Sequence, residues 1–215
     1  MRAKRIRALA LAAGLVGWSF LVPRFPPRWN SVPHVTLGTA LVLVTRAPLG
    51  LCPPELRSGL RHGLVAGAVV ACGVAATTAL PPVRAAMAER ELPDATARWL
   101  ALHVPLGTVW SEEATFRGAL AAVAADAFGP KHGRLLQAAA FGLWHIVDAR
   151  STGQPMVGTV LVTGAAGWWF GWLRERSGSL AAPMLAHLAI NEAGAVAALA
   201  VQRSRDQASR ISATS

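Results

Sequence analysis

The sequence predicts an all-α fold, a polytopic transmembrane helix bundle of about seven to eight spans. Two observations support this prediction. First, 53% of the 215 residues are hydrophobic and only 15% are charged, whereas an ordinary soluble domain is about 25% charged. Second, most charged residues lie in short segments between apolar runs that are long enough to cross a bilayer. Because acyl chains solvate the outer surface of spanning helices, such a bundle does not need the charged surface of a soluble domain.

Seven apolar runs are the expected spans. They are residues 6–22, 32–45, 60–80, 99–128, 135–147, 157–173 and 180–201. The second run is short and contains His34, so it is either tilted or half-buried. The fourth run is too long for one crossing, because a span takes about 20 residues. It either extends beyond the bilayer or breaks near Pro105 and Gly107, and a break would raise the number of spans to about eight.

The first apolar run follows a basic N-terminal segment and could be mistaken for a signal peptide. It is longer than the usual apolar region of such a peptide, and Pro23-Arg24-Phe25 is not a small-residue cleavage site. We therefore expect a retained first transmembrane helix. The whole chain, residues 1–215, is expected to form a single integral membrane domain, with the candidate catalytic motifs within residues 99–200 and a polar, basic tail over residues 202–215.

The formal net charge is +10, which taken alone would be compatible with nucleic-acid binding. The Lys and Arg residues, however, bracket the apolar runs and form no stripe interleaved with aromatic residues. This distribution is typical of topology signals and of contact with anionic headgroups. We expect a multi-pass protein in contact with the lipid bilayer and no nucleic-acid partner. The abundance of Arg and Ala, with Lys4 and Lys131 as the only lysines, indicates a bacterial source. We therefore expect the protein in the bacterial inner or plasma membrane.

The fourth run contains a cluster of charged residues at Glu112, Glu113 and Arg117. Ionisable residues inside membrane spans are costly and are therefore candidates for function. Adjacent residues on a helix point about 100° apart, so the two carboxylates cannot do the same task. Glu113 and Arg117 can form an i, i+4 ion pair on one face, which leaves Glu112 available as a general base. The alternative is that these residues only cap or cross-link helices at a membrane boundary.

Two further clusters lie in separate spans. Phe141 and His145 share one helix face at i, i+4 in the fifth run, and His187 and Asn191 do the same in the seventh. A lone helical histidine is more often a packing residue than a functional one. Asn191 could hold His187 in one tautomer or donate a hydrogen bond directly to an oxyanion.

Together, the three clusters could converge in the centre of a helix bundle. Glu112 would take a proton from water while His145 and His187 stabilise the developing oxyanion, so the combination indicates hydrolysis. Two histidines and a carboxylate are also a known set of zinc ligands, so a metal site formed by Glu112, His145 and His187 is an open alternative. The His-Glu-x-x-His, Gly-x-Ser-Gly and Gly-x-Gly-Asp motifs of other intramembrane proteases do not occur in the sequence.

The three clusters resemble the motifs of the CPBP family of CAAX prenyl proteases and bacteriocin-processing membrane proteins. The family pattern is Glu-Glu-x-x-x-Arg, then Phe-x-x-x-His, then His-x-x-x-Asn or His-x-x-x-Asp, each on a different helix. The corresponding segments here, in the same order, are Glu112-Glu113-x-x-x-Arg117, Phe141-x-x-x-His145 and His187-x-x-x-Asn191. The resemblance covers roughly residues 99–200.

The resemblance implies a bundle of about eight helices and an intramembrane endopeptidase that attacks a peptide bond with a glutamate-activated water. The roles carried over are Glu112 as base, His145 and His187 to orient water or stabilise the oxyanion, Asn191 to assist, and Glu113, Arg117 and Phe141 to support the site. The implied substrate is a membrane-associated protein or peptide. No cofactor is required by this mechanism; zinc is the alternative, less favoured because no fourth ligand is evident.

Two other classes of protein stay open at the level of sequence, as do the substrate, the orientation and the oligomeric state. A non-catalytic immunity or scaffold protein could keep the same bundle without turnover. A small-solute transporter could use the buried Glu and His residues as a proton relay, although the sequence shows no inverted repeat. Cleavage that depends on Glu112 would distinguish the protease from both.

Overall fold

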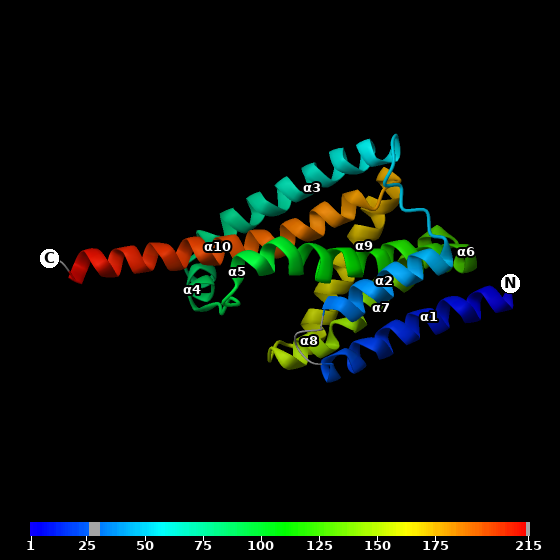
Figure 1. Cartoon of the computed structure of the whole chain (residues 1–215), viewed down its shortest axis with the longest axis horizontal. Coiled ribbons are helices and arrows are strands. Elements are labelled where there is room, and N and C mark those ends of the chain that lie inside the picture. Colours follow the sequence, from blue (N-terminus) through cyan, green and yellow to red (C-terminus); the bar gives the residue numbers. More distant parts are fainter. Residues whose placement is uncertain (26–30, 214–215) are drawn as a thin grey trace.

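The computed structural model describes residues 1–25 and 31–213, and every regular element in them is a helix (Figure 1). This confirms the predicted all-α class. In chain order the helices are α1 Arg2–Leu21, η1 Val22–Arg24, α2 Ser31–Thr45, α3 Glu55–Thr78, α4 Pro81–Glu89, α5 Thr96–Arg98, η3 Trp99–Trp110, η4 Glu113–Leu120, α6 Ala121–Phe128, α7 Pro130–Trp144, α8 Ile146–Ser151, α9 Met156–Ser177 and α10 Ala181–Ala213. The two termini lie at opposite ends of the long axis.

Four helices within the described residues are long and apolar enough to cross a membrane. They are Arg2–Arg24, Glu55–Thr78, Met156–Ser177 and Ala181–Arg210. The Ser31–Thr45 helix is apolar but shorter, in keeping with the short second run of the sequence. A polytopic helical bundle is therefore confirmed, whereas the number of seven to eight spans stays a prediction.

The fourth apolar run is one continuous helical stretch from Thr96 to Phe128, made of α5, η3, η4 and α6. Of the two alternatives for this run, the break near Pro105 and Gly107 does not occur, because Pro105 lies inside η3. A proline removes the ordinary i→i−4 hydrogen bond and its ring crowds that carbonyl group. Both η3 and η4 are π-helical, with i→i+5 bonding, and this wider turn lets the helix pass Pro105 without ending.

Two other boundaries differ from the sequence prediction. The fifth run, expected over residues 135–147, ends at Trp144, and α8 begins at Ile146, so His145 stands between two helices. The predicted polar tail is the last part of α10, which continues to Ala213; residues 214–215 lie outside the described residues. Residues 202–213 contain neither Gly nor Pro, so nothing in their composition stops the helix.

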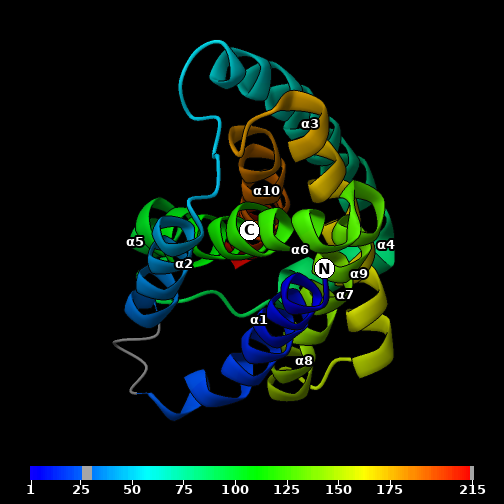
Figure 2. The ribbon, with the colours of Figure 1, turned by 90° about the vertical axis from the view of Figure 1, so that its right-hand side faces the viewer.

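The stretch from Thr96 to Phe128 lies in the middle of the bundle, with α3 and α10 on one side and α1 on the other (Figure 1, Figure 2). One hydrophobic cluster joins α1, η4 and α7 and includes Phe116 and Phe141. A second cluster joins α3, α9 and α10 and includes Phe170 and Ala186. All eight residues of η4 are buried, so this element is the interior wall of the bundle.

A contact between two loops fixes the end of the bundle where α9 meets α10. Gly50 and Gly178 have positive φ angles of 61° and 74°, which glycine adopts without steric cost. A Cβ atom on Gly50 would overlap the Gly178 carbonyl oxygen. Beside it, the Leu180 N–H donates to the Leu49 carbonyl oxygen at 2.8 Å. The segment after α2 is therefore held against the turn between α9 and α10.

Candidate active site

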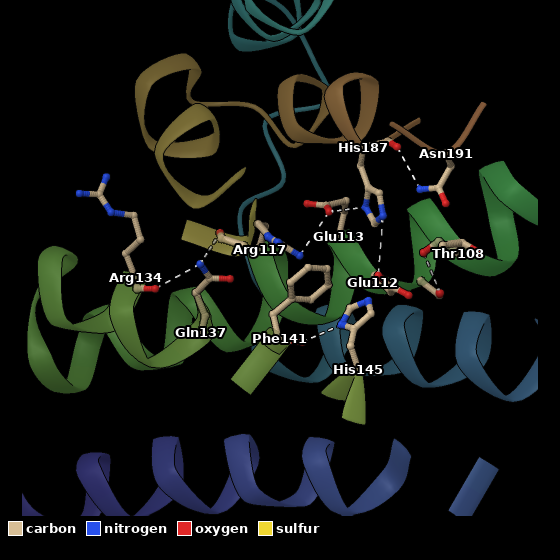
Figure 3. A network of polar contacts seen from close by, with 12 residues as sticks. Thr108, Glu112, Glu113, Arg117, Arg134, Gln137, Phe141, His145, His187 and Asn191 are labelled. Carbon is tan, nitrogen blue, oxygen red and sulfur yellow. Dashed lines mark hydrogen bonds and ion pairs between the residues drawn. The ribbon is translucent and has the colours of Figure 1, made fainter. Parts of the chain in front are cut away.

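Three helical elements bring the motif residues together. Glu112 and Glu113 lie where η3 meets η4, His145 lies at the end of α7, and His187 lies on α10. Figure 3 shows these side chains pointing toward one another between the ribbons. Glu112, Glu113 and His187 are 9%, 0% and 6% exposed. The structure thus brings residues of the three sequence motifs into one polar cluster, in which Glu112, Glu113 and His187 are buried and His145 and Asn191 are half-buried.

Glu113 is the centre of this cluster. Its Oε1 atom lies 3.3 Å from Arg117 Nη1 and 2.8 Å from His187 Nδ1, so the i, i+4 ion pair expected from the spacing is present. Because a carboxylate can only accept, His187 donates through Nδ1–H. In the neutral form of His187, Nε2 is therefore the nitrogen that accepts a hydrogen bond.

Glu112 is the carboxylate outside that ion pair. Its Oε2 atom lies 3.8 Å from His187 Nε2 and has no hydrogen-bond partner among the residues that the structure describes. A distance of 3.8 Å is too long for a direct hydrogen bond, but one water molecule can contact two atoms at this separation. The His145 ring lies beside the Glu112 carboxylate (Figure 3). Glu112 therefore faces both histidines of the site.

His145 owes its orientation to the end of α7. With φ −81° and ψ 3° it leaves the helix as the C-cap residue. Its Nδ1–H donates to the Phe141 carbonyl oxygen at 2.8 Å, which satisfies a carbonyl group of the last helical turn. The ring also packs edge-on against Phe141, with centroids 4.6 Å apart. This leaves Nε2 of His145 available to the site.

The family comparison supports the same segment of the chain. Residues 94–193 match the model of the Rce1-like type II CAAX prenyl endopeptidases, and this range contains every motif residue from Glu112 to Asn191. These residues form a domain of the CPBP family. The match of these residues indicates intramembrane endopeptidase activity, and the four helices that are long and apolar enough to cross a membrane indicate a membrane protein. No curated protein and no solved structure matches the chain.

The CPBP domain also contains a contact residue that the motifs did not predict, Phe170 on α9. Its ring stacks on His187 with centroids 5.1 Å apart. The Arg117 Cζ atom lies 4.9 Å from the Phe170 centroid and 3.9 Å from that of Phe141, so cation–π contacts on two rings supplement its ion pair. Phe170 follows two tryptophans in an apolar run, and nothing in the sequence distinguishes it from a packing residue.

Asn191 lies on α10 one turn after His187. Its Nδ2 group donates to the His187 carbonyl oxygen at 3.1 Å, while the His187 ring is held by Glu113. Glu113 therefore fixes the tautomer of His187. Holding that tautomer was one of the two tasks considered for Asn191. The side-chain amide has a second N–H group, and its action on an oxyanion stays a prediction.

Zinc held by Glu112, His145 and His187 stays the alternative to a metal-free mechanism. Within residues 1–25 and 31–213, no group of three or more His, Cys, Asp and Glu side chains is placed to hold a metal ion. His187 donates Nδ1–H to Glu113, which is the contact that a metal-binding histidine commonly makes through its other ring nitrogen and which leaves Nε2 as the nitrogen that could bind a metal. Cleavage assays with and without a chelator test whether the activity needs a metal.

Proposed function

We propose that this chain is an intramembrane endopeptidase that hydrolyses peptide bonds of membrane-associated proteins or peptides, with water activated by Glu112. The supporting observation is the difference between two adjacent carboxylates. Glu113 contacts Arg117 and His187, whereas Glu112 Oε2 has no hydrogen-bond partner in the described part of the chain and lies 3.8 Å from His187 Nε2. A general base needs a free oxygen within reach of a water molecule. Glu112 Oε2 is free of hydrogen bonds among the described residues, and we place the water between it and His187 Nε2.

The reaction begins with a water molecule held between Glu112 Oε2 and His187 Nε2. Its oxygen attacks the carbonyl carbon of the scissile bond, Glu112 takes one proton, and a negative charge forms on the substrate carbonyl oxygen. Glu113 keeps His187 oriented through Nδ1, so Nε2 accepts a hydrogen bond from the attacking water. The C–N bond then breaks, and Glu112 returns the proton to the departing amine.

The oxyanion requires hydrogen-bond donors that are already in place. Asn191 offers its second N–H group, because its amide is held by the bond to the His187 carbonyl oxygen. His145 contributes from Nε2 when its ring is protonated, since Nδ1 is committed to Phe141. We therefore assign Glu112 as base, His187 to the water, and Asn191 with His145 to the oxyanion.

We also propose a multi-pass location in the plasma membrane of a bacterium. The four helices long and apolar enough to cross a membrane support the multi-pass location. The Arg-rich, Lys-poor composition supports the bacterial origin. A site buried among such helices suits a substrate segment that is itself in or on the bilayer.

Cleavage of a membrane-peptide library by purified protein tests the assignment of Glu112. The variants are Glu112→Ala and, as control, Asp126→Ala, which removes a carboxylate that is 59% exposed from the same helical stretch. General acid–base catalysis contributes about 10²–10⁴-fold. We expect Glu112→Ala to lose a factor of this order while it inserts and folds, and Asp126→Ala to cleave like wild type. Retained cleavage by Glu112→Ala would remove Glu112 from the mechanism.

The same assay with a chelator tests the cofactor. The mechanism above predicts cleavage that chelation does not change. Cleavage that is lost with chelator and restored by zinc would overturn it and assign the two histidines to a metal site. Absence of cleavage from well-folded wild-type protein would favour a non-catalytic membrane protein, such as an immunity or scaffold factor.

A further inference from the structure

A second polar region lies next to the candidate active site. It is a cavity of about 270 Å³ between η4, α6, α7, α9 and the segment that follows α2. Three arginines line it, Arg117, Arg134 and Arg174, together with the acidic residue Glu175. Most of the remaining wall is Ala, Gly and Pro. The polar residues of the wall are these three arginines, Glu175 and Gln137.

Several N–H groups of these arginines are buried without an acceptor. The Arg117 side chain is fully buried; its Nη1 lies 3.3 Å from Glu113 Oε1 as an ion pair, and Nε and Nη2 have no hydrogen-bond partner among the described residues. The Nε atoms of Arg134 and Arg174 are also buried and have no hydrogen-bond partner among the described residues. Buried donors without acceptors are unfavourable and rare. The three arginines thus hold buried donors beside one cavity, and Arg117 among them is already paired with Glu113.

The charge around the cavity is positive. Arg134 pairs with Glu175 at 2.8 Å, and Arg117 pairs with Glu113. Arg174 has no carboxylate partner within the described residues; its guanidinium donates to the carbonyl oxygen of Pro48. One positive charge is therefore uncompensated, and the planar guanidinium fork suits a phosphate, which presents several oxygens at once.

The position of the cavity points to the source of that phosphate. Trp168 and Trp172, both exposed, lie on the part of α9 that contributes Arg174 and Glu175 to the wall. The Arg134 Cζ atom lies 4.5 Å from the Trp168 ring centroid. Exposed tryptophans of membrane proteins gather at the level of the headgroups. The tryptophans therefore favour a position of the cavity near the lipid phosphates.

We propose that the cavity lined by Arg117, Arg134 and Arg174 binds the phosphate group of a phospholipid headgroup. Its volume is roughly nine times that of a water molecule in the liquid, which accommodates a phosphate with part of its glycerol. Arg117 is shared with the cluster around Glu113, but the binding is independent of catalysis at Glu112. Free inorganic phosphate offers the same chemistry, so the experiment includes it.

Binding is measured on the full chain in detergent micelles, as the shift of the unfolding midpoint when phosphatidylglycerol or sodium phosphate is added. Arg174→Gln removes a charge from the cavity. The control Arg176→Gln removes one from an exposed arginine two residues later, outside the wall. One lost charge-assisted hydrogen bond weakens binding by about tenfold or more. We expect phosphatidylglycerol to bind wild type and Arg176→Gln alike and Arg174→Gln at least about tenfold more weakly.

Because Arg174 also bonds to Pro48, a second variant keeps the test independent of that contact. Ala121→Leu places bulk in the cavity wall without changing the charge, and it should weaken phosphatidylglycerol binding as well. Stabilisation by sodium phosphate alone, with the same dependence on Arg174, would keep the phosphate site and overturn the lipid source. Equal affinity in all variants, or no shift of the wild-type midpoint, would overturn the site itself.

Discussion

The element η4 and the helix α3 distribute their residues in opposite ways. All eight residues of η4 are buried, although two of them, Glu113 and Arg117, carry charges. In α3, which has 24 residues, only Gly59, Gly63 and Ala66 are buried. The Leu and Val side chains of α3 are largely exposed. Charge is thus inside and apolar surface outside, the reverse of a soluble domain.

This reversal follows from the surroundings of each element. Acyl chains solvate the apolar face of α3, so that face gains nothing from burial in protein. Charged groups at membrane depth must instead be paired within the bundle, and η4 provides that through Arg117, Glu113 and His187. Substitution of a paired interior charged residue should therefore destabilise the protein strongly. Substitutions on α3 should have little effect on stability except where α3 touches α10.

Glu113→Gln should have the largest effect on stability. It leaves Arg117 buried without its carboxylate, and breaking a buried pair by removing one partner costs about 3–5 kcal/mol. Glu112→Gln is the matched control, because Glu112 Oε2 has no hydrogen-bond partner in the described residues and its loss should leave stability nearly unchanged. Unfolding in mixed detergent micelles compares the two. Equal destabilisation would mean that the Glu113–Arg117 pair does not support the interior wall.

Asn191→Ala should leave the fold intact and reduce turnover. If its amide donates to the oxyanion, its loss should lower kcat about 10²–10³-fold, the range for one oxyanion donor. Gln202→Ala removes another side-chain amide from α10, one that bonds to the Met87 and Arg90 carbonyl oxygens away from the site, and should leave kcat unchanged. A similar kcat in both variants would limit Asn191 to its hydrogen bond within α10.

The contrast between η4 and α3 was only partly predictable from sequence. The pair Glu113–Arg117 followed from i, i+4 spacing, because that spacing fixes a distance within one helix. The approach of His187 to Glu113 depends on how α10 packs against η4, and Phe170 joins the site by the same kind of packing between helices. At Pro105 the sequence leaves a break and a continuous helix open, since a proline favours a break in an α-helix and nothing in the sequence predicts the π-helical turn that accommodates it.

Gly63→Ala should have a moderate effect, at the contact of α3 with α10. A Cβ atom there would lie 2.9 Å from Leu185 Cβ and 3.0 Å from Ala182 Cα, so the two helices must separate. Overpacking of this kind costs about 1–3 kcal/mol. Gly73→Ala on the same helix meets nothing within 4 Å and should be neutral or slightly stabilising. If the two variants unfold alike, small residues do not hold α3 against α10.

Lys4→Ala should have the smallest effect, and it tests the role of burial directly. The Lys4–Asp126 contact is 2.8 Å long, the same as that between His187 and Glu113. Lys4 and Asp126 are 58% and 59% exposed, however, and exposed pairs contribute about 0–1 kcal/mol because water and salt screen them. We expect an unfolding free energy within about 1 kcal/mol of wild type, and a difference that shrinks in added salt. A loss as large as that of Glu113→Gln would show that contact length outweighs burial here, and the contrast between the interior wall and the surface of the bundle would not hold.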